Sequence, residues 1–132
     1  MYGFLKLEFE KYLEGASAEG STQAIAFRLE YPGFRSKNPW NFYVSTSLEN
    51  VVEGFVRALE NTSGFKFEAF NLADAEVDES IVDVQQFIRQ SWPTVPNFTK
   101  GSESLISIAK AQTLLGYSPT RKGSYFPESL VW

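Results

Sequence analysis

The feature that most constrains the fold is a pair of strand-like segments separated by one helix-like segment. In residues 23–31 (QAIAFRLEY), Ile25, Phe27 and Leu29 alternate with the side chains between them, which is the two-residue period of a strand. Residues 65–72 (FKFEAFNL) alternate again. Because strands that alternate with helices favour layered α/β folds, the sequence predicts at least one parallel pair. Two strands are few for an independent sheet, so the pattern also predicts that part of the sheet is missing.

Two segments before the second strand have helical spacing. Residues 3–14 (GFLKLEFEKYLE) place apolar side chains at intervals of four, and the small and polar residues 15–21 predict a loop after them. Residues 46–49 (TSLE) have the spacing of a capping box, which predicts a helix from there to about residue 61. The face of this helix that we expect to be buried carries Val52, Phe55, Val56 and Leu59.

Two further helices are expected after the second strand. Asp78 can cap a helix that continues through Gln90, and a last helix over 107–115 stops at Gly116. The side chains expected to point inward from the first of these are Ile81, Val84, Phe87 and Ile88. The predicted order is helix, strand, helix, strand, helix, helix, within a single α/β domain that covers residues 1–132.

Composition excludes several classes of function. The formal net charge is −4, and the chain has no cysteine and no histidine. The acidic balance argues against a nucleic-acid partner, which normally binds a basic surface. Without Cys and His, a disulfide, a Ser-His-Asp triad and a cysteine nucleophile are impossible, and no metal site is expected. No apolar run approaches the ~20 residues that span a bilayer and no signal peptide is evident, so we expect no membrane partner and a cytoplasmic location.

A tyrosine and a lysine four residues apart stand at the start of the chain, as Tyr2 and Lys6 in YGFLK. At this spacing both side chains project from one face of a helix. An ammonium group favours the phenolate form of a neighbouring tyrosine, which can then act as a general acid or base on a substrate hydroxyl or carbonyl. Such pairs also occur on ordinary helix surfaces, so the pair alone supports either interpretation.

Two other clusters have simpler explanations. The acidic residues Asp74, Glu76, Asp78 and Glu79 lack the central glycine and terminal glutamate of a calcium-binding loop, so we interpret them as a solvated loop with a helix cap. The aromatic residues Phe65, Phe67 and Phe70 could stack on bases, but in an acidic chain core packing is the better interpretation.

Further motifs follow the Tyr2-x-x-x-Lys6 pair in a fixed order. Along the chain they are Arg28-Leu29, Pro32-Gly33, Phe42-Tyr43-Val44, the helical segment from Val51 to Glu60, Phe70-Asn71-Leu72-Ala73, and Ser107-Ile108-x-Lys110-Ala111-x-x-Leu114-Leu115-Gly116-Tyr117-x-Pro119. Together, over about residues 2–119, they resemble the extended short-chain dehydrogenases/reductases, the NAD-dependent epimerase/dehydratase family. The resemblance implies the C-terminal part of a Rossmann-type fold, in which 2–33 end the Rossmann-like core and 34–132 form a region like the family's substrate domain.

The resemblance also implies roles for individual residues. Tyr2 would be the catalytic acid or base, and Lys6 would be both its catalytic partner and a ligand of the nicotinamide ribose. Pro32 and Gly33 would border the nicotinamide. In the segment that reaches the substrate, Arg35 and Asn41 would be substrate-binding residues, Arg35 through a phosphate or carboxylate. A solvated loop position for Arg35 is equally compatible with the sequence.

Departures from the family pattern are as informative as the matches. The glycine-rich phosphate loop and its strand are absent, so the N-terminal dinucleotide-binding half is missing. The catalytic Ser or Thr that precedes the tyrosine is absent as well. Asn50 and Ser107 stand where the family usually has Asp. The family uses NAD or NADP, but we expect this chain to bind neither by itself and to turn over nothing.

Two functional hypotheses follow from these features. The first is a truncated NAD(P)-dependent epimerase, dehydratase or reductase that acts on a nucleotide sugar or a related hydroxylated compound. The alternative is a standalone, non-catalytic binding or assembly module that oligomerises through the face left by the missing half. In that case another copy or a partner would cover the surplus apolar residues Phe4, Leu7 and Phe70. A two-chain enzyme whose cofactor half is encoded separately is a further possibility beside these two.

Overall fold

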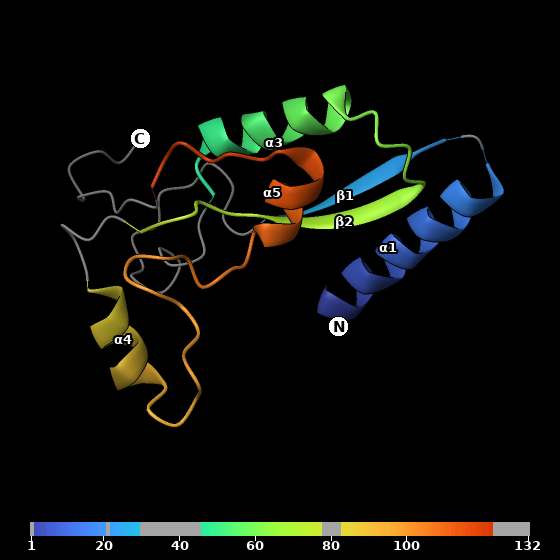
Figure 1. The fold of residues 1–132 in the computed structure, drawn as a ribbon. Coiled ribbons are helices and arrows are strands. Elements are labelled where there is room, and N and C mark those ends of the chain that lie inside the picture. The colour runs from blue at the N-terminus through green and yellow to red at the C-terminus, as the bar shows by residue number, and fades with distance from the viewer. Residues whose placement is uncertain (1, 21, 30–45, 78–82, 123–132) are drawn as a thin grey trace, which may run out of the picture.

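The structure, a computed structural model, describes residues 2–20, 22–29, 46–77 and 83–122. Within these ranges the chain forms helices and strands in the order that the sequence predicts (Figure 1). The elements are α1 (Tyr2–Glu19), β1 (Ala24–Leu29), α3 (Leu48–Glu60), β2 (Phe67–Leu72), α4 (Val84–Ser91) and α5 (Ala109–Leu115).

The two strands pair in parallel, which confirms the predicted parallel pair. The register runs from Ala24 opposite Phe67 to Leu29 opposite Leu72. Among the described residues the sheet has these two strands alone, so the outer edge of β1 has no neighbouring strand there. No residue of β1 is fully buried, whereas β2 carries two buried side chains.

The two-stranded sheet is the middle layer of three. Figure 1 shows α3 over one face of the sheet and α1 over the other. On the α3 side, the rings of Phe27 and Phe55 meet edge to face with their centroids 4.9 Å apart. On the α1 side, the Arg28 guanidinium donates two hydrogen bonds to the Glu10 carboxylate, at 2.8 and 2.6 Å. The alternation in β1 therefore separates an apolar face under α3 from a polar contact with α1.

The hydrophobic core lies between β2 and α5. Phe70, Leu72 and Ala73 at the end of β2 pack against buried side chains of α5 and the residues on either side of it. Those side chains are Ile108, Ala111, Leu115 and Tyr117. A smaller cluster of Val77, Val84 and Ile88 lies beneath α4, so the inward positions of Val84 and Ile88 are confirmed.

Phe70 corrects one expectation, because it is fully buried and not a surplus surface residue. It lies between the strands and α5, with the Lys110 ammonium 5.2 Å from its ring centroid. Lys110 also pairs with Glu68, the neighbour of Phe70 on the same face of β2. Phe4 and Leu7, in contrast, are exposed as expected.

The first helix is longer than the sequence predicted. It continues through Gly15 to Glu19, across residues that we interpreted as a loop. The added turn contains Ala16 and Ala18, strong helix formers, and Ser17, whose small side chain is buried. Tertiary packing therefore extends the helix past its apolar repeat.

The starts of two helices differ from the predicted ones. The predicted capping box over residues 46–49 is wrong. The N-cap of α3 is Ser47, whose side chain makes no capping hydrogen bond. The Thr46 hydroxyl instead donates a hydrogen bond to the Leu72 carbonyl at 2.8 Å. Helix α4 begins at Val84, and the Asp83 carboxylate accepts from the Gln86 amide at 2.8 Å as its cap. The expected cap Asp78 lies outside the described residues, as does Ile81. Helix α5 begins two residues later than predicted and ends at Gly116, in the left-handed region at φ 71°, as the sequence indicated.

The predicted buried face of α3 is wrong. Its buried residues are Asn50 and Gly54, whereas Val52, Val56 and Leu59 are exposed, Leu59 to 86%, and Phe55 is half exposed although its ring touches Phe27. The cause is close packing at Gly54, where a Cβ would overlap a methyl group of the buried Leu72. This close approach turns the side of α3 that carries Gly54 toward the sheet, so most of the apolar side chains of the helix stay exposed.

Two glycine-to-alanine variants test this packing. In Gly54→Ala, the gain in helix propensity, about 1 kcal/mol, is outweighed by overpacking against Leu72, so we expect a net loss of about 1 kcal/mol in unfolding free energy. In Gly15→Ala, the new methyl group meets nothing within 4 Å, so we expect a gain of about 0.5–1 kcal/mol. Urea denaturation followed by circular dichroism measures both. Equal effects in the two variants would contradict the proposed contact.

Candidate functional site

The Tyr2 and Lys6 side chains lie together on one face of α1, as their spacing predicts. The Lys6 ammonium is 4.5 Å from the centroid of the Tyr2 ring, in a cation–π contact. Tyr2 is 74% exposed, so a second molecule can reach its hydroxyl.

The packing of α1 places this pair at one end of the sheet. At the other end of the helix, the Lys66 ammonium just before β2 donates to the carbonyl of Gly20. Toward the carboxyl end of β1, Arg28 binds Glu10, so α1 runs antiparallel to the strands. Tyr2 is eight residues before Glu10, or about 12 Å farther along the helix. Tyr2 therefore lies on the half of α1 toward the carboxyl ends of β1 and β2, where Figure 1 marks the N-terminus. Ligands of open parallel sheets bind at this end.

The remaining predicted site residues fall on undescribed parts of the chain. Pro32, Gly33, Arg35 and Asn41 all lie outside the described residues. Of the predicted site, the structure thus brings together Tyr2 and Lys6.

A buried polar cluster that the sequence did not reveal lies on the far side of the sheet, around Asn50. Its amide nitrogen donates to the Asp74 carboxylate at 2.6 Å and to the Arg121 carbonyl at 3.0 Å. Its amide oxygen accepts from the backbone amides of Thr120 and Arg121 at 2.9 and 3.2 Å. Asp74 also accepts from the amide and hydroxyl of Ser47, both at 2.9 Å. Both Asn50 and Asp74 are buried, so the cluster ties α3, the end of β2 and the C-terminal segment together.

The chemistry of an amide explains why Asn occupies position 50. An amide donates and accepts at once, whereas an ionised carboxylate only accepts. An Asp at this position could not donate to Asp74 and would place a second negative charge beside it. The surroundings of position 50 therefore require an amide rather than a carboxylate.

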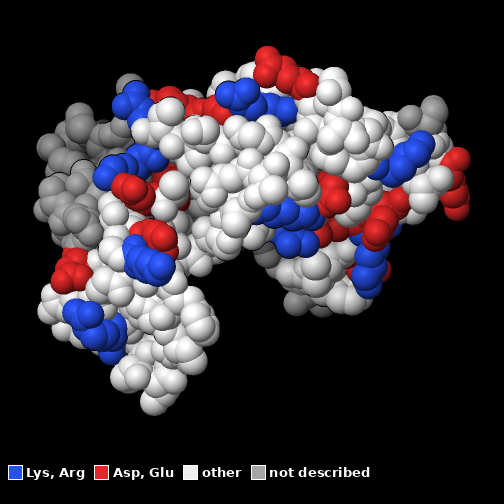
Figure 2. Space-filling model, in the orientation of Figure 1, with Lys and Arg blue, Asp and Glu red and all other residues white. Residues whose placement is uncertain are grey.

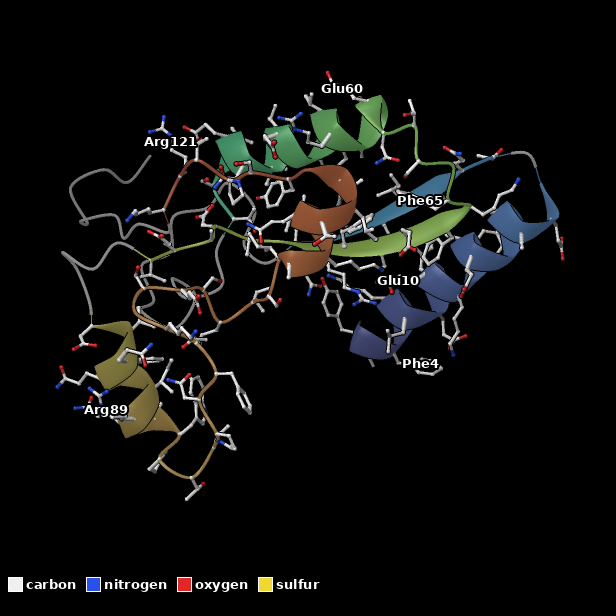
Figure 3. The ribbon with its side chains drawn as sticks, viewed as in Figure 1. Phe4, Glu10, Glu60, Phe65, Arg89 and Arg121 are labelled. Atoms are coloured by element: carbon white, nitrogen blue, oxygen red, sulfur yellow. The ribbon has the colours of Figure 1, made fainter. Side chains whose placement is uncertain are left out.

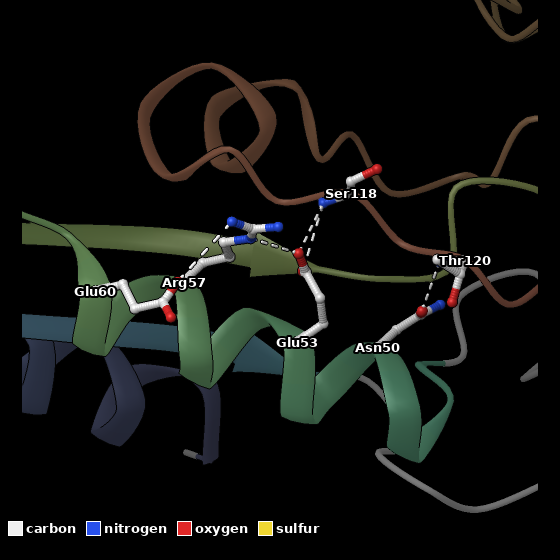
Figure 4. A network of polar contacts seen from close by, with 6 residues as sticks. All are labelled: Asn50, Glu53, Arg57, Glu60, Ser118 and Thr120. Atoms are coloured by element: carbon white, nitrogen blue, oxygen red, sulfur yellow. Dashed lines mark hydrogen bonds and ion pairs between the residues drawn. The ribbon is translucent and has the colours of Figure 1, made fainter.

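A second polar contact holds the same segment to α3 at the surface (Figure 4). The Glu53 carboxylate accepts from the Arg57 guanidinium at 2.8 Å and from the Ser118 amide at 3.4 Å. The hydrogen bond from Arg57 to Glu53 raises the pKa of the guanidinium. Asn50, Glu53 and Arg57 thus form a polar side of α3 that faces the C-terminal segment.

The described residues of the acidic cluster and of the phenylalanine cluster make contacts within the fold. Asp74 belongs to the Asn50 cluster, and the Glu76 carboxylate pairs with the Lys122 ammonium at 2.6 Å. Asp78 and Glu79 are not among the described residues. In the described part of the chain, no group of three or more acidic residues could hold a metal ion. Phe65 packs against Phe70 with ring centroids 6.0 Å apart, which supports the interpretation of these rings as core residues.

A cleft of about 690 Å³ lies beyond the carboxyl end of β2. One wall comes from α4 and the segment after it, the other from the residues that lead into α5. Figure 2 shows the surface hollowed on this side of the lobe that contains α4. The larger apolar residues that line the cleft are Ile88, Trp92, Val95, Pro96, Phe98, Leu105, Ile106 and Ile108. Its lining includes Glu76 and Glu103 but no lysine or arginine, so the described walls suit an uncharged ligand group better than a phosphate.

Comparison with protein-family models, with curated proteins and with solved structures found no match. In the described ranges, none of the helices combines the length and the apolar character that crossing a membrane requires. The family resemblance therefore stays a proposal based on the residues themselves.

Replacing Asn50 by Asp tests the buried cluster. We expect Asn50→Asp to lower the unfolding free energy by about 2–4 kcal/mol at pH 7, because two hydrogen bonds are lost and two carboxylates meet. The loss should shrink near pH 4, where one carboxyl takes up a proton. Urea denaturation at both pH values measures it.

Asn61→Asp is the matched control for this variant. Asn61 also donates to a backbone carbonyl, that of Leu114, but its amide is exposed. We expect a change of about 0.5 kcal/mol or less. A loss in Asn50→Asp that is the same at both pH values would contradict the charge argument.

Tyr117 predicts a dependence of stability on alkaline pH. Burial raises the pKa of its phenol, and the nearby carboxylates of Asp74 and Glu53 raise it further. A raised pKa means that the folded state favours the neutral phenol. The resulting contribution to the free energy of unfolding is complete below the ordinary tyrosine pKa of about 10, and it is lost as the pH rises above that value. Tyr117→Phe removes the hydrogen bond to the Ala73 carbonyl, which should lower the free energy of unfolding by about 1 kcal/mol. The variant also lacks the titrating phenol, so it should lose the pH dependence that the phenol causes. Urea denaturation from pH 8 to pH 11 should therefore show the parent losing stability faster than the variant, and parallel curves would contradict it.

Proposed function

We propose that this chain is the C-terminal part of an NAD(P)-dependent epimerase, dehydratase or reductase of the extended short-chain dehydrogenase type. Its substrate would be a nucleotide sugar or a related hydroxylated compound. One observation carries the proposal: Tyr2 and Lys6 meet on one face of α1, on the half of the helix toward the carboxyl ends of a parallel strand pair. This is the end of an α/β sheet at which ligands and cofactors bind.

In this proposal Tyr2 moves a proton at the substrate. Its exposed hydroxyl would give a proton to a carbonyl oxygen or take one from a hydroxyl group. The Lys6 ammonium would stabilise the negative charge that develops on the phenol oxygen and would bind the ribose of the cofactor. A bound nicotinamide would supply or accept the hydride.

The proposal requires a dinucleotide-binding half from outside this sequence. The sequence holds no glycine-rich phosphate loop that could cradle NAD or NADP. Pro32 and Gly33 keep their proposed place beside the nicotinamide, and Arg35 and Asn41 keep theirs at the substrate. By itself the chain would then be inactive.

The cleft beyond β2 supports a substrate-side role for the second part of the chain. It lies at the same end of the sheet as Tyr2, and its volume falls in the usual range for small-molecule sites. Its apolar, aromatic walls would contact the uncharged part of a substrate. A phosphate would need a cation from elsewhere, for which Arg35 is the proposed residue.

A chimera tests the role of Tyr2. The dinucleotide-binding half of a known extended short-chain dehydrogenase, cut just before its own Tyr-x-x-x-Lys helix, would be fused to Tyr2. We expect the chimera to bind NADH and to reduce NAD slowly with nucleotide sugars, as measured by NADH fluorescence. Tyr2→Phe should lower this rate by about 10²–10⁴-fold without weakening NADH binding, because only proton transfer is lost.

Tyr12→Phe is the matched control, since Tyr12 lies on the same helix and is 70% exposed. It should leave the rate unchanged. In the isolated chain we expect no micromolar NADH binding. Micromolar binding by the chain alone, or equal rates for the two variants, would contradict the proposal.

A further inference from the structure

Helix α1 carries an apolar stripe that no described residue covers. Tyr2, Leu5, Phe9 and Tyr12 follow one another at intervals of three and four, the spacing of a helix–helix seam. All four are mostly exposed, and no charged residue interrupts the stripe. The side of α1 toward the sheet is defined by its least exposed residues, Glu10, Leu13 and Ser17. The stripe is centred about a quarter-turn away from that side.

Helix α3 carries a second apolar stripe. Figure 4 shows Asn50, Glu53 and Arg57 directed toward the C-terminal segment, and the stripe occupies the opposite side of the helix. Its members are Leu48, Val52, Phe55, Val56 and Leu59, all of them exposed. Because Phe55 touches Phe27 of β1, this side of α3 lies over β1 and not over β2.

Both stripes flank the outer edge of β1. Because α1 is right-handed and runs antiparallel to β1, Leu5 and Phe9 lie on its β1 side, whereas Leu7 lies on its β2 side. The edge between the stripes is itself open. The Ala24 amide donates to Lys66 beside β2, so the amides of Ile25, Phe27 and Leu29 point the other way. We call the two stripes and this edge the β1 face.

We infer that a second copy of the chain covers the β1 face, with the two β1 strands antiparallel about a twofold axis perpendicular to the sheet. This symmetry places α1 against α1 on one side of the sheet and turns the two α3 stripes toward each other on the other side. Each stripe then meets its own copy, and no charge on either stripe is removed from water. The contact also gives the outward backbone groups of β1 hydrogen-bonding partners.

The position of α1 on the sheet fits this arrangement. Helix α1 contacts both strands, so its axis lies about half a strand spacing inside β1. With strands ~4.8 Å apart, the two copies of α1 would be about 10 Å apart, a normal distance for packed helices.

The area also suffices. The nine exposed side chains of the two stripes offer on the order of 1,000 Å² per copy, against the roughly 800 Å² per partner of a stable complex. A short peptide on the β1 edge would leave most of this area uncovered. The inference does not depend on the proposed function, because it concerns only the surface of this chain.

The test is the mass of the purified 132-residue chain in solution. Sedimentation equilibrium should give twice the chain mass of 14.9 kDa. A monomer at roughly 100 µM, a concentration far above a typical dimer Kd, would overturn the inference.

Matched variants locate the contact. Leu5 and Leu7 are 60% and 52% exposed on the same helix, but only Leu5 lies on the β1 face. Leu5→Glu and Leu59→Glu should each raise the dimer Kd at least roughly tenfold, because each buries a charge. Leu7→Glu should leave it unchanged, and circular dichroism checks the fold of each variant. A dimer unaffected by Leu5→Glu, or weakened equally by Leu7→Glu, would place the contact elsewhere and overturn the inference.

A disulfide gives an independent readout, since the chain has no cysteine and a single introduced one can only link two copies. Residue 12 of α1 lies near the middle of β1, so the two copies of Tyr12 meet close to the twofold axis. Tyr12→Cys should form a covalent dimer under mild oxidation, whereas Leu7→Cys should not. Equal cross-linking of both variants would contradict the proposed symmetry.

Discussion

The burial of β2 is the constraint on which the rest of this structure depends. Phe70 and Leu72 are fully buried because α3, α5 and Tyr117 all pack against this one strand. Gly54 brings α3 close enough to touch Leu72, and the Asn50–Asp74 contact fastens the helix there. With the packing elements gathered on β2, β1 is left with apolar side chains and only partial cover.

The order of elements was predictable from the sequence because it depends on local patterns. The two-residue period of β1 and β2 and the stop at Gly116 need no tertiary information. The burial of α3 could not be predicted in the same way. Hydrophobicity selects the side of Leu59 as the inward side, but the close approach at Gly54 to Leu72 decides the orientation. A glycine that serves as a contact surface has no apolar side chain to mark it.

The same distinction between local and long-range contacts applies to the candidate site. The contact of Tyr2 with Lys6 follows from helical spacing, so the sequence predicted it. The Asn50 cluster joins residues from positions 47 to 121, and a single sequence does not indicate which of its polar residues meet over that distance. The one available signal was Asn50 itself, a polar residue at the start of a helix where the resembling family has Asp.

The open edge of β1 has a consequence for how abundance would relate to activity. A strand edge accepts one neighbour, so a second copy on the β1 face and a cofactor-binding half that continued the sheet from β1 would exclude each other. Self-association grows with the square of the chain concentration, whereas docking of the other half grows only in proportion to it. The more of this chain a cell made, the smaller the share that could join a catalytic assembly. Overproduction would then increase the amount of catalytic assembly by less than the increase in the chain itself.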